Sequence, residues 1–97
     1  MYDHGTRVSG PLFAAFCLAR PAGGAFARLG LTVPRAVGGS VDRNRIKRRL
    51  REAFRRHYRE LDPRWDIVLN PRRTALAAPF ADLERALRKV IEKCNAS

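Results

Sequence analysis

The segment RNRIKRRLREAFRR (residues 43–56) constrains the fold most, because it combines dense positive charge with helical periodicity. Its apolar residues recur every three or four positions, and residues at that spacing lie on one face of a helix. The stripe continues beyond the segment and comprises Ile46, Leu50, Ala53, Phe54, His57, Tyr58 and Leu61. We therefore predict a long helix, begun by Ser40 as N-cap and ended by Asp62-Pro63, that packs through its stripe and shows a cationic outer surface.

The flanking sequence predicts strands before this helix and a strand and a helix after it. The expected strands are residues 6–9, 12–19, 26–33 and 65–70, with a turn at RPAGG (20–24), a loop at 71–78 and a last helix at about 79–93. In the third strand Leu29, Leu31 and Val33 alternate with small or polar residues, which indicates one apolar face. The strands on either side of the long helix are expected to be parallel neighbours.

This order of elements predicts an α+β fold made of one domain, residues 1–97. The expected architecture is a two-layer α/β sandwich, in which a mixed sheet of about four strands carries helices on one face. Hydrophobic residues make up 45% of the chain, which is ordinary for a globular protein.

The charge indicates a polyanionic partner. The net charge is +11, and residues 42–60 hold nine basic residues against three acidic ones. Eight of the nine are arginines, whose planar fork of donors can grip a phosphate through two hydrogen bonds. The longest apolar run, residues 12–19, is too short to cross a membrane, and no signal peptide is evident. We expect a cytoplasmic protein that binds nucleic acid.

A solvated helix face is the alternative explanation of the charge. Such a face normally carries acidic partners four residues from its bases, and this segment has few. We therefore expect the basic side chains to fan over the outer surface of the helix and contact phosphates: Arg45, Lys47, Arg48, Arg49 and Arg51. The segment Arg43-Asn44-Arg45 is expected near the first turn, where free backbone N–H groups favour an anion and the Asn44 amide can donate and accept.

No catalytic or metal site is predicted in the protein itself. His57 lies on the apolar stripe and is expected to be packed and hydrogen-bonded, while His4 stands near a terminus. The carboxylates are scattered and form no cluster suited to Mg²⁺. Cys17 and Cys94 lack the spacing of a zinc site, and we expect two reduced thiols.

These residues resemble the bacterial ribonuclease P protein component. The likeness is carried by RNRIKRRLREAF, which follows a strand ending in GLTV and a loop VGGSV, and it extends from His4 to about residue 93. Further matching positions are Gly5, Phe13, Gly30, Gly38 and the triplet Asp66-Ile67-Val68.

The resemblance implies a function and a set of binding residues. In that family a large RNA subunit removes the 5′ leader of precursor tRNA by Mg²⁺-dependent hydrolysis, and the protein, a monomer within the ribonucleoprotein, binds this RNA and the leader and aids metal binding. The implied RNA-subunit contacts are Arg43, Asn44, Arg45, Lys47, Arg48 and Arg51. The implied leader contacts are Phe13 and Phe16, placed together on a sheet cleft, and Arg35. The protein would hold no metal tightly.

The resemblance also implies a fold like domain 2 of ribosomal protein S5, with a left-handed βαβ crossover through the Arg-Asn-Arg helix. Family members usually begin with a basic helix that forms one wall of the leader cleft. This sequence starts at about the point where that helix ends, so we expect either a truncated start or a natural variant. Pro34 and Ala36 stand where the family favours polar or basic residues after the third strand. A structured-RNA-binding protein of the ribosomal type is the alternative function.

Overall fold

The computed structural model describes residues 5–19, 28–61 and 65–96. The strands are β1 (Gly5–Ser9), β2 (Phe13–Ala19), β3 (Arg28–Leu31) and β4 (Trp65–Pro71), and the helices are α1 (Ser40–His57) and α2 (Phe80–Ala96). Three short 3₁₀ helices complete the described part: η1 (Arg35–Val37), η2 (Tyr58–Glu60) and η3 (Arg73–Leu76). The predicted turn at residues 20–24, the helix stop at 62–63 and His4 lie outside the described residues.

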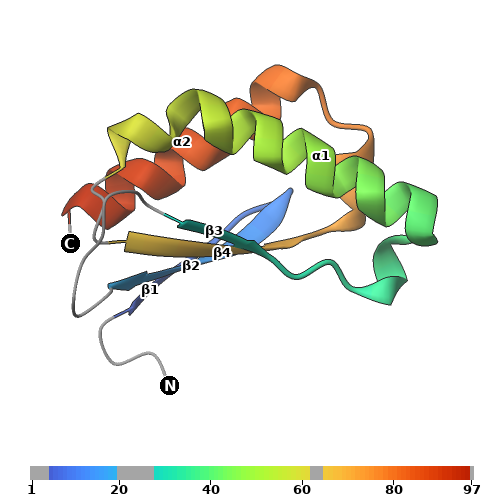
Figure 1. The fold of residues 1–97 in the computed structure, drawn as a ribbon, viewed down its shortest axis with the longest axis horizontal. Coiled ribbons are helices and arrows are strands. Elements are labelled where there is room, and N and C mark those ends of the chain that lie inside the picture. The colour runs from blue at the N-terminus through green and yellow to red at the C-terminus, as the bar shows by residue number, and fades with distance from the viewer. Residues whose placement is uncertain (1–4, 20–27, 62–64, 97) are drawn as a thin grey trace.

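The four strands form one mixed sheet in the order β1-β2-β4-β3. Strand β2 pairs antiparallel with β1 and β4, whereas β3 and β4, which α1 connects, pair in parallel. Both helices cover the same face of this sheet (Figure 1). The predicted two-layer α+β architecture and the parallel pairing around the long helix are confirmed.

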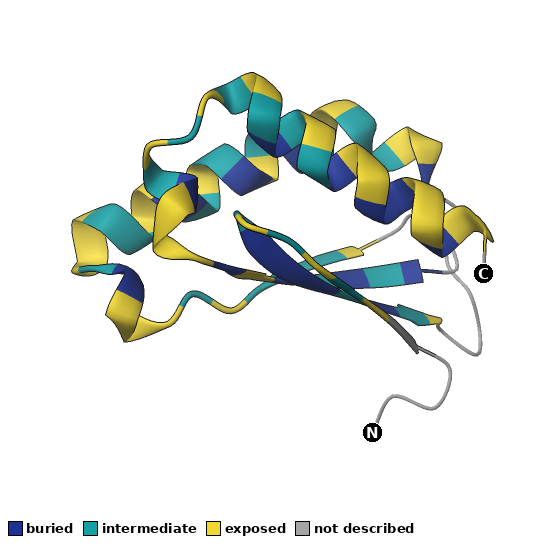
Figure 2. Cartoon of the chain, turned by 180° about the vertical axis from the view of Figure 1, so that it is seen from behind, coloured by how far each residue is buried: buried dark blue, intermediate teal, exposed yellow. Residues whose placement is uncertain are grey.

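The core lies between the sheet and the two helices. On β4 the residues Trp65, Ile67 and Leu69 are buried beneath the helices, and the residues between them are not. Because successive strand residues point to opposite faces, this alternation separates a covered face from an open one. From α1, Ile46 and Leu50 are fully buried. Figure 2 shows that the buried positions of the helices face the sheet.

Helix α1 begins one residue earlier than the sequence predicts. Gly39 is its N-cap and makes no side-chain capping hydrogen bond, so the expected N-cap Ser40 is instead the first helical residue. The backbone of Gly39 is extended, with φ −72° and ψ −176°, so the helical conformation begins at Ser40. The preceding Gly38 has a φ of 154°, which disfavours other residues, and a Cβ there would lie 2.6 Å from Oδ2 of Asp42. The Asp42 carboxylate thus lies against Gly38, in the first turn, where negative charge favours a helix.

Candidate functional site

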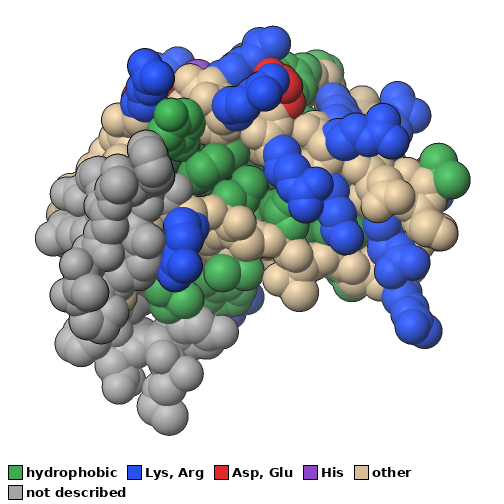
Figure 3. Space-filling view, viewed as in Figure 1, with side chains coloured by type: hydrophobic (Ala, Val, Ile, Leu, Met, Phe, Trp, Pro, Cys, Tyr) green, Lys and Arg blue, Asp and Glu red, His purple; other side chains and the backbone are tan. Residues whose placement is uncertain are grey.

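The outer surface of α1 carries the group of residues that we call the basic ridge. It consists of Arg43, Asn44, Arg45, Lys47, Arg48 and Arg51. Arg43 and Lys47 are half-buried along the flank of the helix, and the other four are exposed. Figure 3 shows Lys and Arg side chains spread along this helix, with little acidic surface between them. Because Ile46 and Leu50 lie on the buried side of α1, the ridge residues lie on the side that faces solvent.

The positive charge of the ridge is not balanced by any acid in the described part of the chain. Within the described residues, no ridge side chain forms a salt bridge, and Arg43 Nε is buried without a hydrogen-bond partner. Asp42 is the one acidic residue in the first three turns of α1, and it lies against Gly38. Like charges at this spacing repel one another, so an external anion would stabilise the surface. Because α1 starts at Ser40, the Arg43 N–H already donates to the Gly39 carbonyl, and the free N–H groups precede the Arg-Asn-Arg segment.

Arg49 does not belong to this outer surface, contrary to the sequence prediction. Its guanidinium donates to the carbonyls of Ala75 and Leu76, each at an N···O distance of 2.7 Å, and to that of Ala78. These carbonyls stand at the end of η3 and just after it, where a 3₁₀ helix leaves acceptors unused. Arg49 therefore fastens α1 to the segment that follows β4.

The C-terminal part of α1 differs, because its bases are paired with acids; we call this region the paired end. Glu52 accepts from Arg55 at 2.8 Å, and Glu84 of α2 lies 3.8 Å from Arg56. The paired end comprises Glu52, Arg55, Arg56, His57, Glu60 and Glu84. Here the positive charge is already balanced by the protein.

His57 is held at both ring nitrogens. Nδ1 lies 2.8 Å from a Glu60 carboxylate oxygen, and Nε2 lies 2.9 Å from a Glu84 oxygen. The hydrogen bond with Glu60, then that with Glu84, raises the pKa of His57, and burial opposes the rise. Because a carboxylate only accepts, both bonds require the imidazolium form. The prediction of a packed and hydrogen-bonded histidine is confirmed.

The open face of the sheet offers a second surface. Phe16 of β2 and Val68 of β4 stand side by side on it, and the Arg7 guanidinium lies 5.7 Å from the centroid of the Phe16 ring. Gly30 of β3 pairs with Val68, and a Cβ there would come within 3.5 Å of Val68 Cγ2. The glycine thus keeps this part of the face flat.

Phe13 does not share that face, so its predicted placement is wrong. It is 3% exposed and belongs to the core, whereas Phe16 is half-buried on the other side of the sheet. The two residues are three apart on one strand and so must point to opposite faces. Strand alternation in the sequence predicts opposite faces for the two residues, whereas the family resemblance implied that both lie on the same cleft.

A cleft of about 380 Å³ adjoins the open face at the end of β4. Its lining residues are Arg7, Ala14, Pro34, Ala36, Val37, Asn70, Pro71, Arg72 and Arg73. Arg72 Nε donates to the Gly10 carbonyl at 2.9 Å, and Arg73 donates to the Val37 carbonyl at 2.8 Å. Arg35 is exposed on η1, beside this cleft in the chain. Sequence reasoning missed Asn70, Arg72 and Arg73; the polar run NPRR after a buried strand was the available signal.

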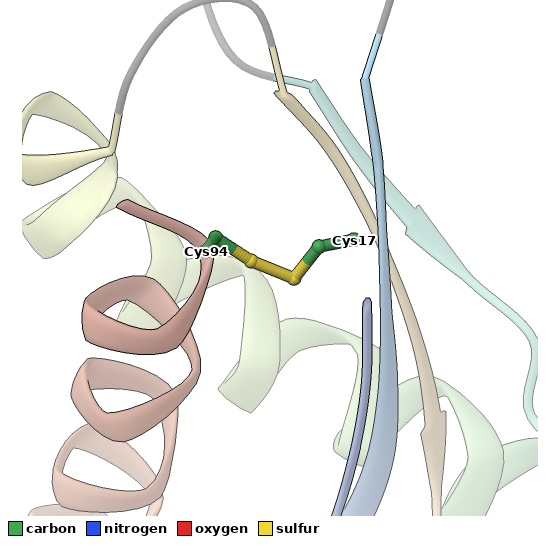
Figure 4. Close-up of a disulfide and its surroundings, with 2 residues drawn as sticks. All are labelled: Cys17 and Cys94. Carbon is green, nitrogen blue, oxygen red and sulfur yellow. A yellow bond between two sulfur atoms is a disulfide. The ribbon is translucent and has the colours of Figure 1, made fainter. Parts of the chain in front are cut away.

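The two cysteines are bonded to each other, which corrects the expectation of two reduced thiols. Cys17 of β2 and Cys94 of α2 form a disulfide with a Cα–Cα distance of 6.3 Å (Figure 4). Cys17 points to the covered face and Cys94 lies on the buried side of α2, so packing brings them together across 77 positions of sequence. Among the described residues there is no group of three or more His, Cys, Asp or Glu side chains able to hold a metal ion.

Comparison with known proteins identifies the family. The sequence model of the ribonuclease P family, described as "Ribonuclease P", matches residues 1–95. The chain belongs to this family. Its ribonuclease P relatives include the protein component of Desulfosudis oleivorans, 46% identical over 68 residues, which are 70% of this chain and 56% of that protein. The component of Maridesulfovibrio salexigens is 36% identical over 97% of this chain and 77% of its own.

Solved ribonuclease P proteins share the fold. The protein from Thermotoga maritima superposes with a TM-score of 0.80 and 26% identity, over 93% of this chain and 84% of that one. The protein from Staphylococcus aureus gives a TM-score of 0.73 and 26% identity, over 91% and 79% of the two chains. The matched segment spans only 56–60% of the length of four curated relatives, those of Desulfosudis, two Roseiflexus and Finegoldia magna. No helix in the described part of the chain is long and apolar enough to cross a membrane.

Proposed function

We propose that this chain acts as the protein subunit of a ribonuclease P ribonucleoprotein, which removes the 5′ leader of precursor tRNA. The observation that carries the proposal is the basic ridge: a row of bases on α1 that forms no ion pair with the acids of the described residues, in a chain of the ribonuclease P family. Proteins whose charge serves only solubility place acids among such bases, as the paired end of the same helix does.

The ridge is the surface that would bind the RNA subunit. Arg45, Arg48 and Arg51 can each form two hydrogen bonds with a phosphate, and Asn44 can contact a ribose hydroxyl or a base edge. The buried stripe holds the helix on the sheet, so these side chains stand on a rigid support. Binding releases counterions from the RNA, and affinity should therefore fall steeply with salt.

The open face and its adjoining cleft would bind the single-stranded leader. The half-buried Phe16 ring offers a surface on which a base can stack, and Arg7 beside it supplies positive charge. Arg35, on η1, would extend this path toward the ridge. Phe13 is buried in the core and does not take part in the proposed contact.

Catalysis is assigned to the RNA subunit, which would use Mg²⁺ ions held by RNA. The protein would contribute by neutralising phosphates where the RNA folds and where the leader lies, which lowers the Mg²⁺ concentration that the complex needs. In this proposal the chain is one monomer within a cytoplasmic ribonucleoprotein.

The test combines the protein with a bacterial ribonuclease P RNA and a precursor tRNA at low Mg²⁺ concentration. We expect binding to this RNA and faster leader removal than by the RNA alone. Absence of both effects would refute the proposal. Equal binding to any structured RNA without an effect on cleavage would instead support a ribosomal type of RNA-binding protein, and cleavage without added RNA would support a protein-only nuclease.

A further inference from the structure

One apolar side chain stands out on the surface of α1. Val41 is 81% exposed, and it is the one large hydrophobic residue in the described part of the chain that is exposed to this degree. A single exposed apolar residue is common on protein surfaces, so exposure alone does not indicate a binding contact, and the residues around Val41 decide.

Its neighbours belong to the basic ridge. Residues three, four and seven positions further along a helix share a face, and for Val41 these are Asn44, Arg45 and Arg48. All three are exposed, and none forms an ion pair within the described residues. Because helical side chains lean toward the N-terminus, the aliphatic stem of Arg45 inclines toward Val41. An apolar spot therefore lies at the N-terminal edge of the cationic surface.

Local structure gives no reason for a valine at this position. It is the second residue of α1, where an acidic side chain would favour the helix dipole and where a β-branched side chain is a weaker helix former than alanine. It also contributes nothing to the core, because it faces away from Ile46 and Leu50. A role in contact with another molecule accounts for it better than folding does.

RNA has the chemistry that matches this mixture. Its surface places anionic phosphates next to ribose carbons and the apolar faces of unpaired bases. A partner that is only a polyanion would favour a further base at position 41. We propose that Val41 is an apolar contact of the ridge, and that it covers a nucleobase or ribose face of the structured RNA whose phosphates Arg45 and Arg48 bind. The inference rests on the proposed function and adds a contact of a different kind to it.

The proposed Val41 contact and the arginine contacts should differ in how the affinity for RNA depends on salt. Binding of a phosphate releases counterions, so each arginine adds roughly 0.7 to 0.9 to the salt slope of the affinity. Burial of an apolar group releases none, so Val41 should add affinity that is the same at low and high salt. Removing one buried methyl-sized group should weaken binding roughly fourfold.

The experiment measures the affinity of the full chain for a bacterial ribonuclease P RNA over a range of salt concentrations. Val41→Thr keeps the shape and the β-branch but replaces a methyl by a hydroxyl, and Val41→Ile keeps the apolar character. We expect Val41→Thr to bind roughly fourfold more weakly at every salt concentration, with an unchanged slope and an unchanged melting temperature. Val41→Ile should bind within about twofold of the wild type.

Arg45→Gln provides the matched control, because it should lower the slope by roughly 0.7 to 0.9. Wild-type affinity of Val41→Thr, an equal loss in Val41→Ile, or a change of slope in Val41→Thr would each overturn the inference. If the wild-type chain does not bind this RNA at all, the proposed function itself fails. The two failures are therefore distinguishable.

Discussion

The two ends of helix α1 have similar sequences but different charge environments. No side chain of the basic ridge forms an ion pair among the residues that the structure describes, and Asp42, the acid of the first turn, lies against Gly38. The paired end has Glu52 on the same helix, Glu60 on η2 and Glu84 on α2, and these carboxylates engage Arg55, Arg56 and His57. Both ends are held by one buried stripe, so the difference lies in the acids around the bases: Glu52 on the helix itself, and Glu60 and Glu84 on other elements.

This difference shows that arginine-rich sequence is not by itself a binding surface. Arg49 stands within the same run of basic residues, yet its guanidinium donates to backbone carbonyls at the end of η3 and just after it. Arg56 lies near a glutamate and over the Phe80 ring, 4.9 Å from its centroid. Only bases that the protein leaves without a partner would be stabilised by contact with an RNA phosphate.

The largest effect is expected from the buried stripe that supports both ends. Leu50 is fully buried, and Leu50→Ala should lower the free energy of unfolding by about 2–5 kcal/mol, because it leaves a cavity. Arg48→Ala, two residues away on the exposed side, should weaken RNA binding with little change in stability. Urea denaturation of both variants checks this. Equal destabilisation would mean that the inner and outer faces of α1 are wrongly assigned.

The next effect separates the ridge from the paired end directly. Arg45→Gln with Arg48→Gln should weaken RNA binding by about 100-fold at low salt and lower the salt slope by about 1.4 to 1.8, because two phosphate contacts are lost. Arg55→Gln with Arg56→Gln removes the same charge from the paired end. Filter binding over a salt series compares the two. We expect a much smaller loss in the second variant, and similar losses would remove the distinction between the two ends.

A smaller effect should mark Arg49 as a structural residue between the two ends. Arg49→Leu leaves the carbonyls at the end of η3 and just after it without their charged donor, and it should lower the free energy of unfolding by about 1–2 kcal/mol. Arg48→Leu is the control at an exposed position and should leave stability nearly unchanged. Thermal unfolding measures both. A larger change of the salt slope in Arg49→Leu than in Arg48→Leu would contradict the assignment.

The smallest effect concerns pH and the paired end. The folded-state pKa of His57 is raised above its ordinary value of 6.5 by Glu60 and Glu84. The stabilisation is therefore complete below about pH 6.5 and is lost as the pH rises through the higher folded-state pKa. In melting curves from pH 5.5 to 9, His57→Gln should differ most from the wild type at low pH. A difference that grows as the pH rises would show that His57 is not held as the imidazolium.

The order of the elements and their inner faces could be predicted from the sequence. Helical spacing of Ile46, Leu50 and Phe54 and strand alternation around Ile67 are local patterns, and burial in the structure follows them. The expected fold class and the parallel pairing of β3 with β4 also hold. Of the candidate site residues, those of the ridge lie on the outer surface of α1, as the helical spacing predicts, and their contacts with RNA remain predictions.

The predictions for the cysteines and for Arg49 were wrong because these contacts join distant parts of the chain. The prediction of the N-cap was wrong because a general residue preference did not hold at this turn. The disulfide between Cys17 and Cys94 spans 77 positions, and the Arg49 contacts depend on where η3 comes to lie. Gly39 and not Ser40 is the N-cap, because the backbone is already helical at Ser40. The placement of Phe13 was a different error, since strand alternation alone would have corrected it.

The sequence by itself determined that α1 is a long helix with an apolar inner face and a basic outer face. Periodicity and charge are properties of consecutive residues, and they act before any tertiary contact exists. Only the tertiary structure decided which bases remain available, since Glu84 and the carbonyls after η3 reach α1 from residues that are far away in the chain. The free energy of a charged side chain depends on what surrounds it in space, and folding sets those surroundings.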